Sequence, residues 1–143
     1  MTATHNILTL SWSGGRSGGG RISSARIGAD LAIPARNGGT GAGMDPKSFL
    51  AASAAECLLL NLVAVLDASG VEHGGISVET AAHGGGADEI SIIHHLTLPL
   101  SGTAVTNDRI VRLIDKAEAA CSIGNLLKSA GVGITLTHSI TRG

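Results

Sequence analysis

The sequence predicts an α+β fold for this chain of 143 residues, and three observations support that class. Alternating apolar and polar residues, which are typical of strands, occur near both ends of the chain and in its middle. Two longer segments carry apolar residues at helical spacing. The strands are grouped instead of alternating one by one with helices, which favours α+β over a doubly wound sheet. We expect the order βββ-α-ββ-α-β in a single domain spanning residues 1–143.

The first third of the chain is expected to form three strands joined by loops. Five glycines within residues 14–20 predict a turn or loop, because glycine adopts positive φ without strain. Gly28 divides the second strand from the third, and Pro34 ends the third. A second glycine-rich loop follows at residues 36–45. The predicted strands are 6–13, 21–27 and 29–33.

A long helix is predicted to begin at Asp45-Pro46, since Asp is a good N-cap and Pro suits the first helical position. It runs to about Ala68, and Gly70 supplies the stop. The helix is apolar on almost every side, so we expect it in the middle of the fold. Its most apolar stretch, residues 50–66, is shorter than the about 20 residues of a membrane-spanning helix and contains polar residues. We therefore interpret it as a buried helix and expect no membrane partner.

The rest of the chain predicts a hairpin, a second helix and a final strand. Glycines at 84–86 connect the two hairpin strands. Thr106 or Asn107 caps a helix that reaches Cys121, and the helical pattern can continue over 122–129. The predicted strands are 76–82, 89–98 and 132–140.

Composition and charge exclude several classes of function. Hydrophobic residues make up 43% of the chain and charged residues 15%, with one Trp, one Phe and no Tyr, so the core must be aliphatic. The net charge is −1 and the ten basic residues are scattered, which argues against binding of nucleic acid. The first ten residues lack the charged-then-apolar order of a signal peptide, so we expect a cytoplasmic location.

The two cysteines, Cys57 and Cys121, are the main candidates for chemistry. Two cysteines make no disulfide framework in a chain of this length. They could be small buried hydrophobes, or a reactive and a resolving thiol. A reactive Cys57 needs a nearby cation to lower its pKa, and Arg16 in the first glycine-rich loop is the most suggestive one. Arg16 could equally be a solvated loop residue. The other nearby candidates are Arg21, Arg26 and Arg36.

Other catalytic and metal-binding patterns are missing from the sequence. The six histidines include the pair His94-His95, which would point to opposite faces of a strand. No cysteine or histidine pair has zinc-type spacing, no glycine-rich segment continues into a phosphate loop, and no serine lies in a GxSxG elbow. We therefore predict neither a metal nor a cofactor.

Three segments together resemble the OsmC/Ohr family of osmotically inducible and organic-hydroperoxide-resistance proteins. The first is GGRSG at residues 14–18, which is similar to the family's turn after one short strand. The second is GGTG at 38–41 followed by DPKSFLAASAAEC at 45–57, with the family's distance from proline to the first cysteine. The third is AACSI at 119–123, which is similar to the family's second-cysteine helix. The resemblance covers nearly the whole chain.

The resemblance implies an intertwined homodimer of antiparallel sheets packed around long central helices. It also implies a thiol peroxidase that reduces organic hydroperoxides. Cys57 would attack the peroxide as a thiolate and become a sulfenic acid, and Cys121 would condense with it to a disulfide. Arg16 would stabilise the thiolate and orient the peroxide. A dithiol, which in the family is a lipoylated protein, would reduce the disulfide.

Two residues depart from the family pattern. Lys47 stands where the family has a glutamate that pairs with the arginine, and Ser122 stands where the family often has proline. Two alternatives to a peroxidase therefore remain. One is a dimer that senses redox state or binds a small molecule with little turnover. The other is a stress-induced homodimer with inert cysteines.

Overall fold

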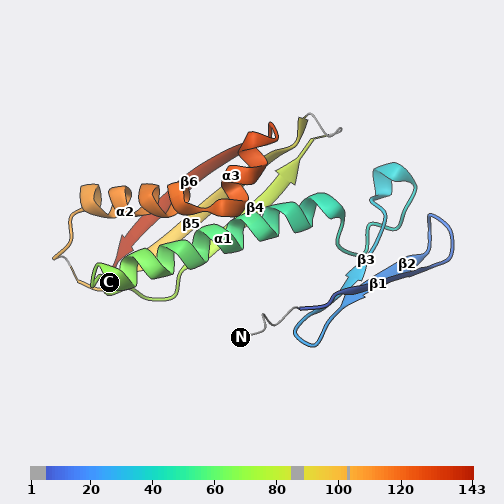
Figure 1. The fold of residues 1–143 in the computed structure, drawn as a ribbon, viewed down its shortest axis with the longest axis horizontal. Helices are drawn as coiled ribbons and strands as arrows, with labels where there is room; N and C mark the ends of the chain where they lie inside the picture. The colour runs from blue at the N-terminus through green and yellow to red at the C-terminus, as the bar shows by residue number, and fades with distance from the viewer. Residues whose placement is uncertain (1–5, 85–88, 103) are drawn as a thin grey trace, which may run out of the picture. The chain divides into compact units, whose positions relative to one another are not determined.

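The computed structural model describes residues 6–84, 89–102 and 104–143. The chain forms two compact units, Met1–Phe49 and Leu50–Gly143. The expected α+β class is confirmed: each unit contains one small sheet, and the helices follow in the predicted order (Figure 1).

The first unit contains an antiparallel meander in the order β1-β2-β3. Each strand is shorter than the sequence predicts. The predicted second strand ends early because the Ser24 side chain accepts hydrogen bonds from the backbone N–H groups of Arg26 and Ile27, at 3.0 and 3.2 Å, and so turns the chain. The strands are β1 (Thr9–Ser13), β2 (Gly19–Ser23) and β3 (Gly28–Leu31).

The loop between β1 and β2, which carries Arg16, is held by Trp12. The indole N–H donates to the carbonyls of Gly14 and Gly15, at 3.1 and 3.2 Å. Gly14 has a φ of 85°, and a side chain on Gly18 would collide with the Ser13 carbonyl. Gly14 and Gly18 of the GGRSG segment are therefore structural requirements of this tight loop.

Helix α1 (Pro46–Ala68) begins and ends where the sequence predicts. The Asp45 carboxylate accepts hydrogen bonds from the Ser48 amide, at 3.3 Å, and from the Ser48 hydroxyl. These bonds lower the pKa of Asp45. At the other end Gly70 adopts a φ of 68°, which stops the helix.

In the second unit, helices cover one face of a three-stranded sheet (Figure 1). Its further elements are β4 (Ser77–His83), β5 (Ser91–Leu100), α2 (Asn107–Ala120), α3 (Ser122–Ser129) and β6 (Gly133–Arg142). The Thr106 hydroxyl caps α2 by accepting from the Arg109 amide at 3.2 Å, which decides between the two predicted caps. The helical pattern does continue past Cys121, but as a separate helix.

The pairing in this sheet differs from the expectation of wholly antiparallel sheets. Strands β4 and β5 are antiparallel, whereas β5 and β6 are parallel. Two helices lie between β5 and β6 in the sequence, and such a crossover returns the chain in the same direction. Strand β5 also continues through Pro99 to Leu100, beyond its predicted end. Proline is tolerated there because the β4 ladder already ends at Thr97, so no β4 carbonyl needs its missing N–H.

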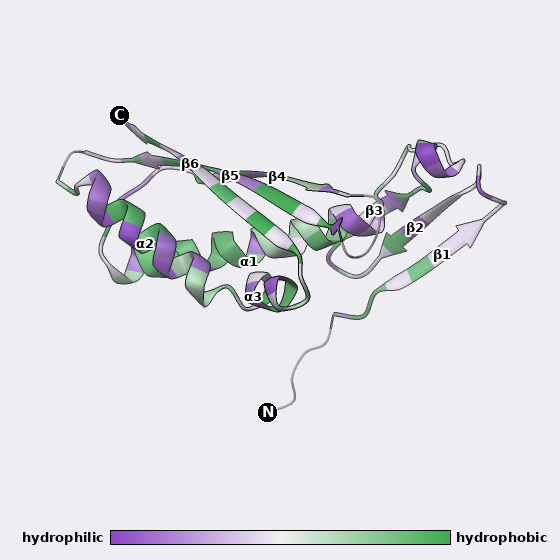
Figure 2. Ribbon diagram, turned by 90° about the horizontal axis from the view of Figure 1, so that it is seen from above, coloured by the Kyte–Doolittle hydropathy of each residue, from purple (hydrophilic) through white to green (hydrophobic). Residues whose placement is uncertain are grey.

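The core of the second unit is aliphatic, as expected. Alternate residues of β5 are buried, from Ile92 to Leu100. Figure 2 shows hydrophobic segments along this strand. Leu62 and Leu66 of α1 pack in the same cluster as Leu96 and Leu98 of β5. Helix α2 adds buried isoleucines to this cluster.

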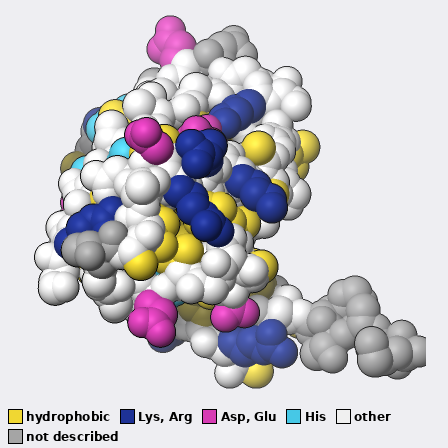
Figure 3. Space-filling view, turned by 90° about the vertical axis from the view of Figure 1, so that its left-hand side faces the viewer, with side chains coloured by type: hydrophobic (Ala, Val, Ile, Leu, Met, Phe, Trp, Pro, Cys, Tyr) yellow, Lys and Arg dark blue, Asp and Glu magenta, His cyan; other side chains and the backbone are white. Residues whose placement is uncertain are grey.

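The expectation that α1 is covered on all sides is wrong for the single chain. One face of the helix is buried, but Leu60 is 59% exposed and Val63 and Leu50 are exposed as well. In the first unit Leu10 and Trp12 are also exposed. On the face drawn in Figure 3, hydrophobic side chains lie open between basic and acidic ones. Length and composition alone would let α1 cross a membrane, but core helices pass the same test.

Candidate two-thiol site

The second unit brings the two cysteines together from distant parts of the sequence. Cys57 lies in the middle of α1, and Cys121 lies at the junction of α2 and α3. Both are free thiols; Cys57 is half-buried and Cys121 is buried. The Cys121 thiol donates to the carbonyl of Ala54 at 3.8 Å, one turn before Cys57 on α1, and so lies beside Cys57. The separation of Cys57 and Cys121 in the sequence could not show that the two residues lie close together.

The start of α3 stabilises a negative charge on Cys57. Burial acts to raise the pKa of the Cys57 thiol. Hydrogen bonds from the Ile123 amide, the Cys121 thiol, and the hydroxyl and amide of Ser122 outweigh burial, so the pKa lies below its ordinary value. The Ser122 Oγ lies 3.9 Å from the Cys57 sulfur. The helix N-terminus adds its partial positive charge. The groups that lower the pKa of Cys57 therefore belong to α3 and not to α1, the helix that carries Cys57.

Cys121 has the opposite character. Burial raises the pKa of its thiol, and the neighbouring Cys57 raises it further. The Gly124 amide donates to the Cys121 sulfur at 3.3 Å, so the side chain caps the N-terminus of α3. The pair is therefore asymmetric: Cys57 is the easier to ionise and Cys121 remains a thiol.

Asn61 is a residue of this site that sequence reasoning did not single out. Its side-chain amide donates to the Cys57 carbonyl at 2.8 Å and lies 3.6 Å from the Cys57 sulfur. The sequence could have identified Asn61, because it is the lone side-chain amide in a nearly apolar helix and lies one helical turn after Cys57.

His94 is a second residue near the thiols that the sequence did not assign to the site. The predicted opposite orientation of the two histidines is confirmed. His94 is buried on the helix-covered face of β5, whereas the His95 ring bonds to Thr137 at 2.7 Å and Ser139 at 3.2 Å on the other face. Only the fold could show that His94 lines the same small cavity as Cys121.

Arg16 belongs to the first unit, whereas both cysteines belong to the second. The Arg16 side chain is exposed and lines an open hollow with Ile33, Arg36 and Asn37. Within the described residues it takes part in no ion pair. Its role as partner of the Cys57 thiolate stays a prediction. Lys47, the departure from the family pattern, lies in the first turn of α1.

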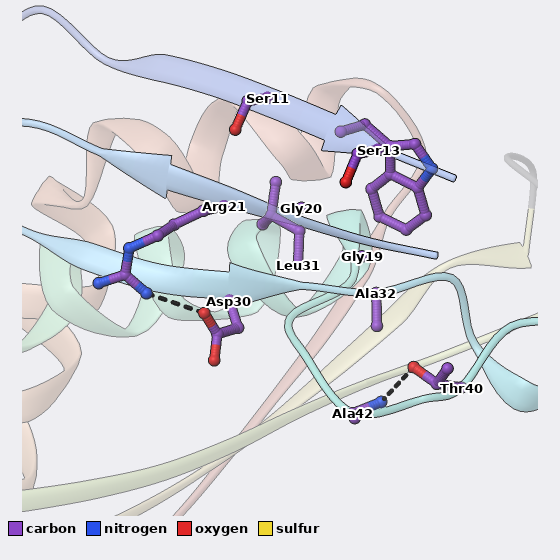
Figure 4. Close-up of a pocket in the computed structure, with 11 residues that line it drawn as sticks. Ser11, Ser13, Gly19, Gly20, Arg21, Asp30, Leu31, Ala32, Thr40 and Ala42 are labelled. Carbon is purple, nitrogen blue, oxygen red and sulfur yellow. Dashed lines mark hydrogen bonds and ion pairs between the residues drawn. The ribbon is translucent and has the colours of Figure 1, made fainter. Parts of the chain in front are cut away.

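Arg21, another candidate cation for the Cys57 thiolate, lies in a second hollow of the first unit and already has an acidic partner. This hollow, of about 480 Å³, is lined by residues of all three strands (Figure 4). Its Arg21 forms an ion pair with Asp30 at 2.8 Å, drawn as a dashed line in Figure 4. Arg21 is thus already neutralised by a neighbouring strand. The lining contains no thiol and no histidine.

The fold and the asymmetric cysteine pair define an α+β protein with a two-thiol site. A model of the family described as OsmC-like protein matches residues 39–137. The chain therefore belongs to the OsmC-like family, as the sequence segments predict.

Individual relatives agree with this assignment. The chain is 28% identical to the uncharacterised protein YmaD of Bacillus subtilis (strain 168), covering 100% of this chain and 99% of YmaD. An organic hydroperoxide resistance protein from Elizabethkingia anophelis has a similar fold, with a TM-score of 0.73, 21% identity and coverage of 98% and 100% of the two chains. Another, OsmC from Legionella pneumophila, has a TM-score of 0.69, 20% identity and coverage of 96% and 99%.

Proposed function

We propose that this protein is a thiol-dependent peroxidase that reduces organic hydroperoxides. The observation that carries the proposal is the placement of the two thiols: the Cys57 sulfur lies 3.9 Å from the hydroxyl of Ser122, the neighbour of Cys121, and the Cys121 sulfur lies 3.8 Å from the Ala54 carbonyl on the helix of Cys57. The Cys57 thiolate attacks the terminal peroxide oxygen, the O–O bond breaks, and the alkoxide leaves and takes up a proton as an alcohol. Cys57 is then a sulfenic acid.

The Cys57–Cys121 disulfide forms in the second step. The Cys121 sulfur attacks the sulfenic sulfur, and water leaves with the sulfenic oxygen. An external dithiol then reduces this disulfide by thiol–disulfide exchange, restores both thiols and is itself oxidised to a disulfide. A lipoylated protein is the candidate dithiol that the family resemblance implies. A reducing cytosol would supply such a dithiol and fits a cytoplasmic location.

Exposed apolar groups in each unit favour an organic substrate over hydrogen peroxide. In the second unit Leu60, one helical turn after Cys57 on α1, has an exposed apolar side chain. In the first unit an apolar hollow of about 590 Å³ is lined by both aromatic side chains of the sequence, Trp12 and Phe49. Relatives of similar fold are named for organic hydroperoxide resistance. Alkyl chains would gain free energy by leaving water in such surroundings.

We expect the reduced protein to consume cumene hydroperoxide with a dithiol reductant at least tenfold faster than hydrogen peroxide. The apolar part of cumene hydroperoxide can contribute binding energy that hydrogen peroxide lacks, and about 1.4 kcal/mol corresponds to tenfold. Loss of peroxide is followed over time at equal concentrations of both substrates. Equal rates near background would contradict the peroxidase. One rapid oxidation without repeated turnover would favour the redox-sensing dimer, the alternative that Lys47 supports.

We expect the pKa of Cys57 to rise in both Arg16→Ala and Ser122→Pro. The first change removes the proposed cation. The second removes an amide and a hydroxyl that face Cys57, at the first position of α3, where proline is tolerated. Because the thiolate reacts with iodoacetamide, the midpoint of alkylation rate against pH would move to higher pH.

The matched controls for this measurement are Arg26→Ala, another loop arginine of the first unit, and Ser122→Ala, which keeps the backbone N–H. Arg26→Ala should leave the curve in place, and Ser122→Ala should shift it less than Ser122→Pro. An unchanged midpoint in Arg16→Ala would remove Arg16 from the site.

The homodimer that the resemblance implies is also part of the proposal. Its support is the apolar surface that each unit leaves uncovered by itself: Leu60 and Val63 on α1 in the second unit, and Leu10 and Trp12 on β1 in the first. Exposed apolar side chains favour association, because their burial in an interface removes them from water. In a dimer α1 would become the central helix that its sequence predicts.

A further inference from the structure

A buried histidine beside the cysteine pair has no part in the chemistry proposed so far. His94 lies on the inner face of β5 and is 3% exposed. Its Nδ1 lies 2.8 Å from the Thr80 hydroxyl of β4. Within the described residues its Nε2 has no hydrogen-bond partner. A buried polar group in an aliphatic core is costly, so its presence there calls for a physical reason.

The imidazole borders a cavity that it shares with Cys121. The cavity measures about 10 Å³, which admits one water molecule at most. Glu118 at the end of α2 also lines it, and the rest of the lining is aliphatic or glycine. A proton can therefore pass between the Cys121 thiol and the ring over a single hydrogen-bonded relay in this cavity.

The second step of the proposed reaction needs a proton acceptor at this place. Cys121 must lose its proton before its sulfur can attack, because the thiolate is the nucleophile. Burial keeps that proton on the thiol by raising its pKa. Cys57, the neighbour of Cys121, has lost its negative charge once it is a sulfenic acid and can no longer take up that proton as a thiolate.

We propose that His94 accepts the proton of Cys121 when Cys121 attacks oxidised Cys57, an assignment that rests on the proposed thiol chemistry of this pair. In the tautomer that this role requires, the Nδ1–H donates to the Thr80 hydroxyl oxygen, 2.8 Å away, and the lone pair of Nε2 is available. Nε2 takes the thiol proton as the new S–S bond forms. The sulfenic oxygen leaves as hydroxide, and the proton held by His94 returns to it to form water.

The charges around the ring suit this role. Burial lowers the pKa of His94, so the ring is neutral and able to accept a proton at neutral pH. Glu118 acts in the opposite direction and would stabilise the imidazolium, while Lys128 of α3, which lies 3.4 Å from Glu118, weakens that effect. Helix α1 and strand β6 contribute only aliphatic side chains to the cavity.

An aromatic disulfide tests this assignment without any peroxide. Reduced protein is mixed with 5,5′-dithiobis(2-nitrobenzoate), and Cys57 releases the first nitrothiobenzoate as it forms a mixed disulfide. Cys121 then attacks the Cys57 sulfur and releases the second. In His94→Gln we expect the first release to keep its rate at pH 7 and the second to slow by roughly 100-fold, the lower end of what a positioned base contributes.

The pH dependence separates a proton acceptor from a packing role. In the unaltered protein the second release should be nearly independent of pH between 7 and 9. In His94→Gln it should rise with pH towards the unaltered rate, because hydroxide then removes the thiol proton. His95→Gln is the matched control, since it lies one residue further on the opposite face of β5 and should change neither release.

Three results would overturn the proposal: an unchanged second release in His94→Gln, a deficit equal at every pH, or an equal loss in His95→Gln. The same variants are mixed with one equivalent of cumene hydroperoxide and quenched with dimedone, and the sulfenic acid is measured by mass. Accumulation of the sulfenic acid in His94→Gln alone supports the proposal. If no protein reacts with the hydroperoxide, the peroxidase function fails, while the aromatic disulfide still decides the role of His94.

Discussion

The Cys57→Ser variant is expected to lose hydroperoxide consumption, falling to the background rate of the reductant alone. Serine has nearly the same shape, but its hydroxyl stays protonated in surroundings that ionise a thiol. Removal of the attacking group commonly costs roughly a thousandfold or more, since only binding and orientation remain. Consumption of cumene hydroperoxide with excess dithiol measures the loss. A variant with substantial remaining turnover would place the attacking group elsewhere.

The matched control is Cys121→Ser, which removes the other thiol of the same pair. This variant should still react once with hydroperoxide, because Cys57 and the α3 amide of Ile123 are unchanged. Its sulfenic acid cannot close to the disulfide, so dimedone should trap it and mass spectrometry should find the adduct on Cys57. If both serine variants behaved like the unaltered protein, the cysteines would be inert, which is the second alternative to a peroxidase.

The Leu62→Ala variant is expected to lose about 2–5 kcal/mol of unfolding free energy, the usual cost of a buried leucine truncation. Leu62 has no exposed surface and packs between α1 and β5 in the main cluster. Because small proteins are stable by only about 5–15 kcal/mol, the denaturation midpoint should fall clearly. Unfolding in urea, followed by far-UV circular dichroism, measures this shift.

A leucine on the surface of α3 provides the control for this loss. Leu126 is 65% exposed, so Leu126→Ala should change the free energy by less than about 0.5 kcal/mol. Both variants must be compared at one protein concentration, since association would add to the measured stability. Similar midpoints for Leu62→Ala and the unaltered protein would contradict the packing of α1 against the sheet.

Local signals predicted most of the elements. Asp45 and Pro46 mark the start of α1 because capping chemistry acts within a single turn, and Gly70 marks its end by its positive φ. The predicted strand ends are wrong where they depend on hydrogen bonds or on the length of a neighbouring strand. The turn at Ser24 shortened a predicted strand through side-chain hydrogen bonds, and β5 ran through Pro99 because its partner strand had already ended.

Local sequence likewise predicts some residues of the candidate site, whereas others are brought to it only by the fold. Its two cysteines are identified by the segments around residues 45–57 and 119–123, which also predict the family that the comparison confirms. Asn61 could have been found from its spacing to Cys57, since helical spacing is a local property. Nothing local, however, shows that Ser122 faces Cys57, because the two residues belong to different helices.

The sequence by itself determined the α+β class, the aliphatic core and the family, since each follows from composition, periodicity or a short motif. Only the tertiary structure decided that β6 runs parallel to β5, that the start of α3 lowers the pKa of Cys57, and that His94 shares a cavity with Cys121. The physical reason is that hydrogen bonding and desolvation depend on distances of a few ångströms between atoms. Those distances are set by packing of segments far apart in the chain.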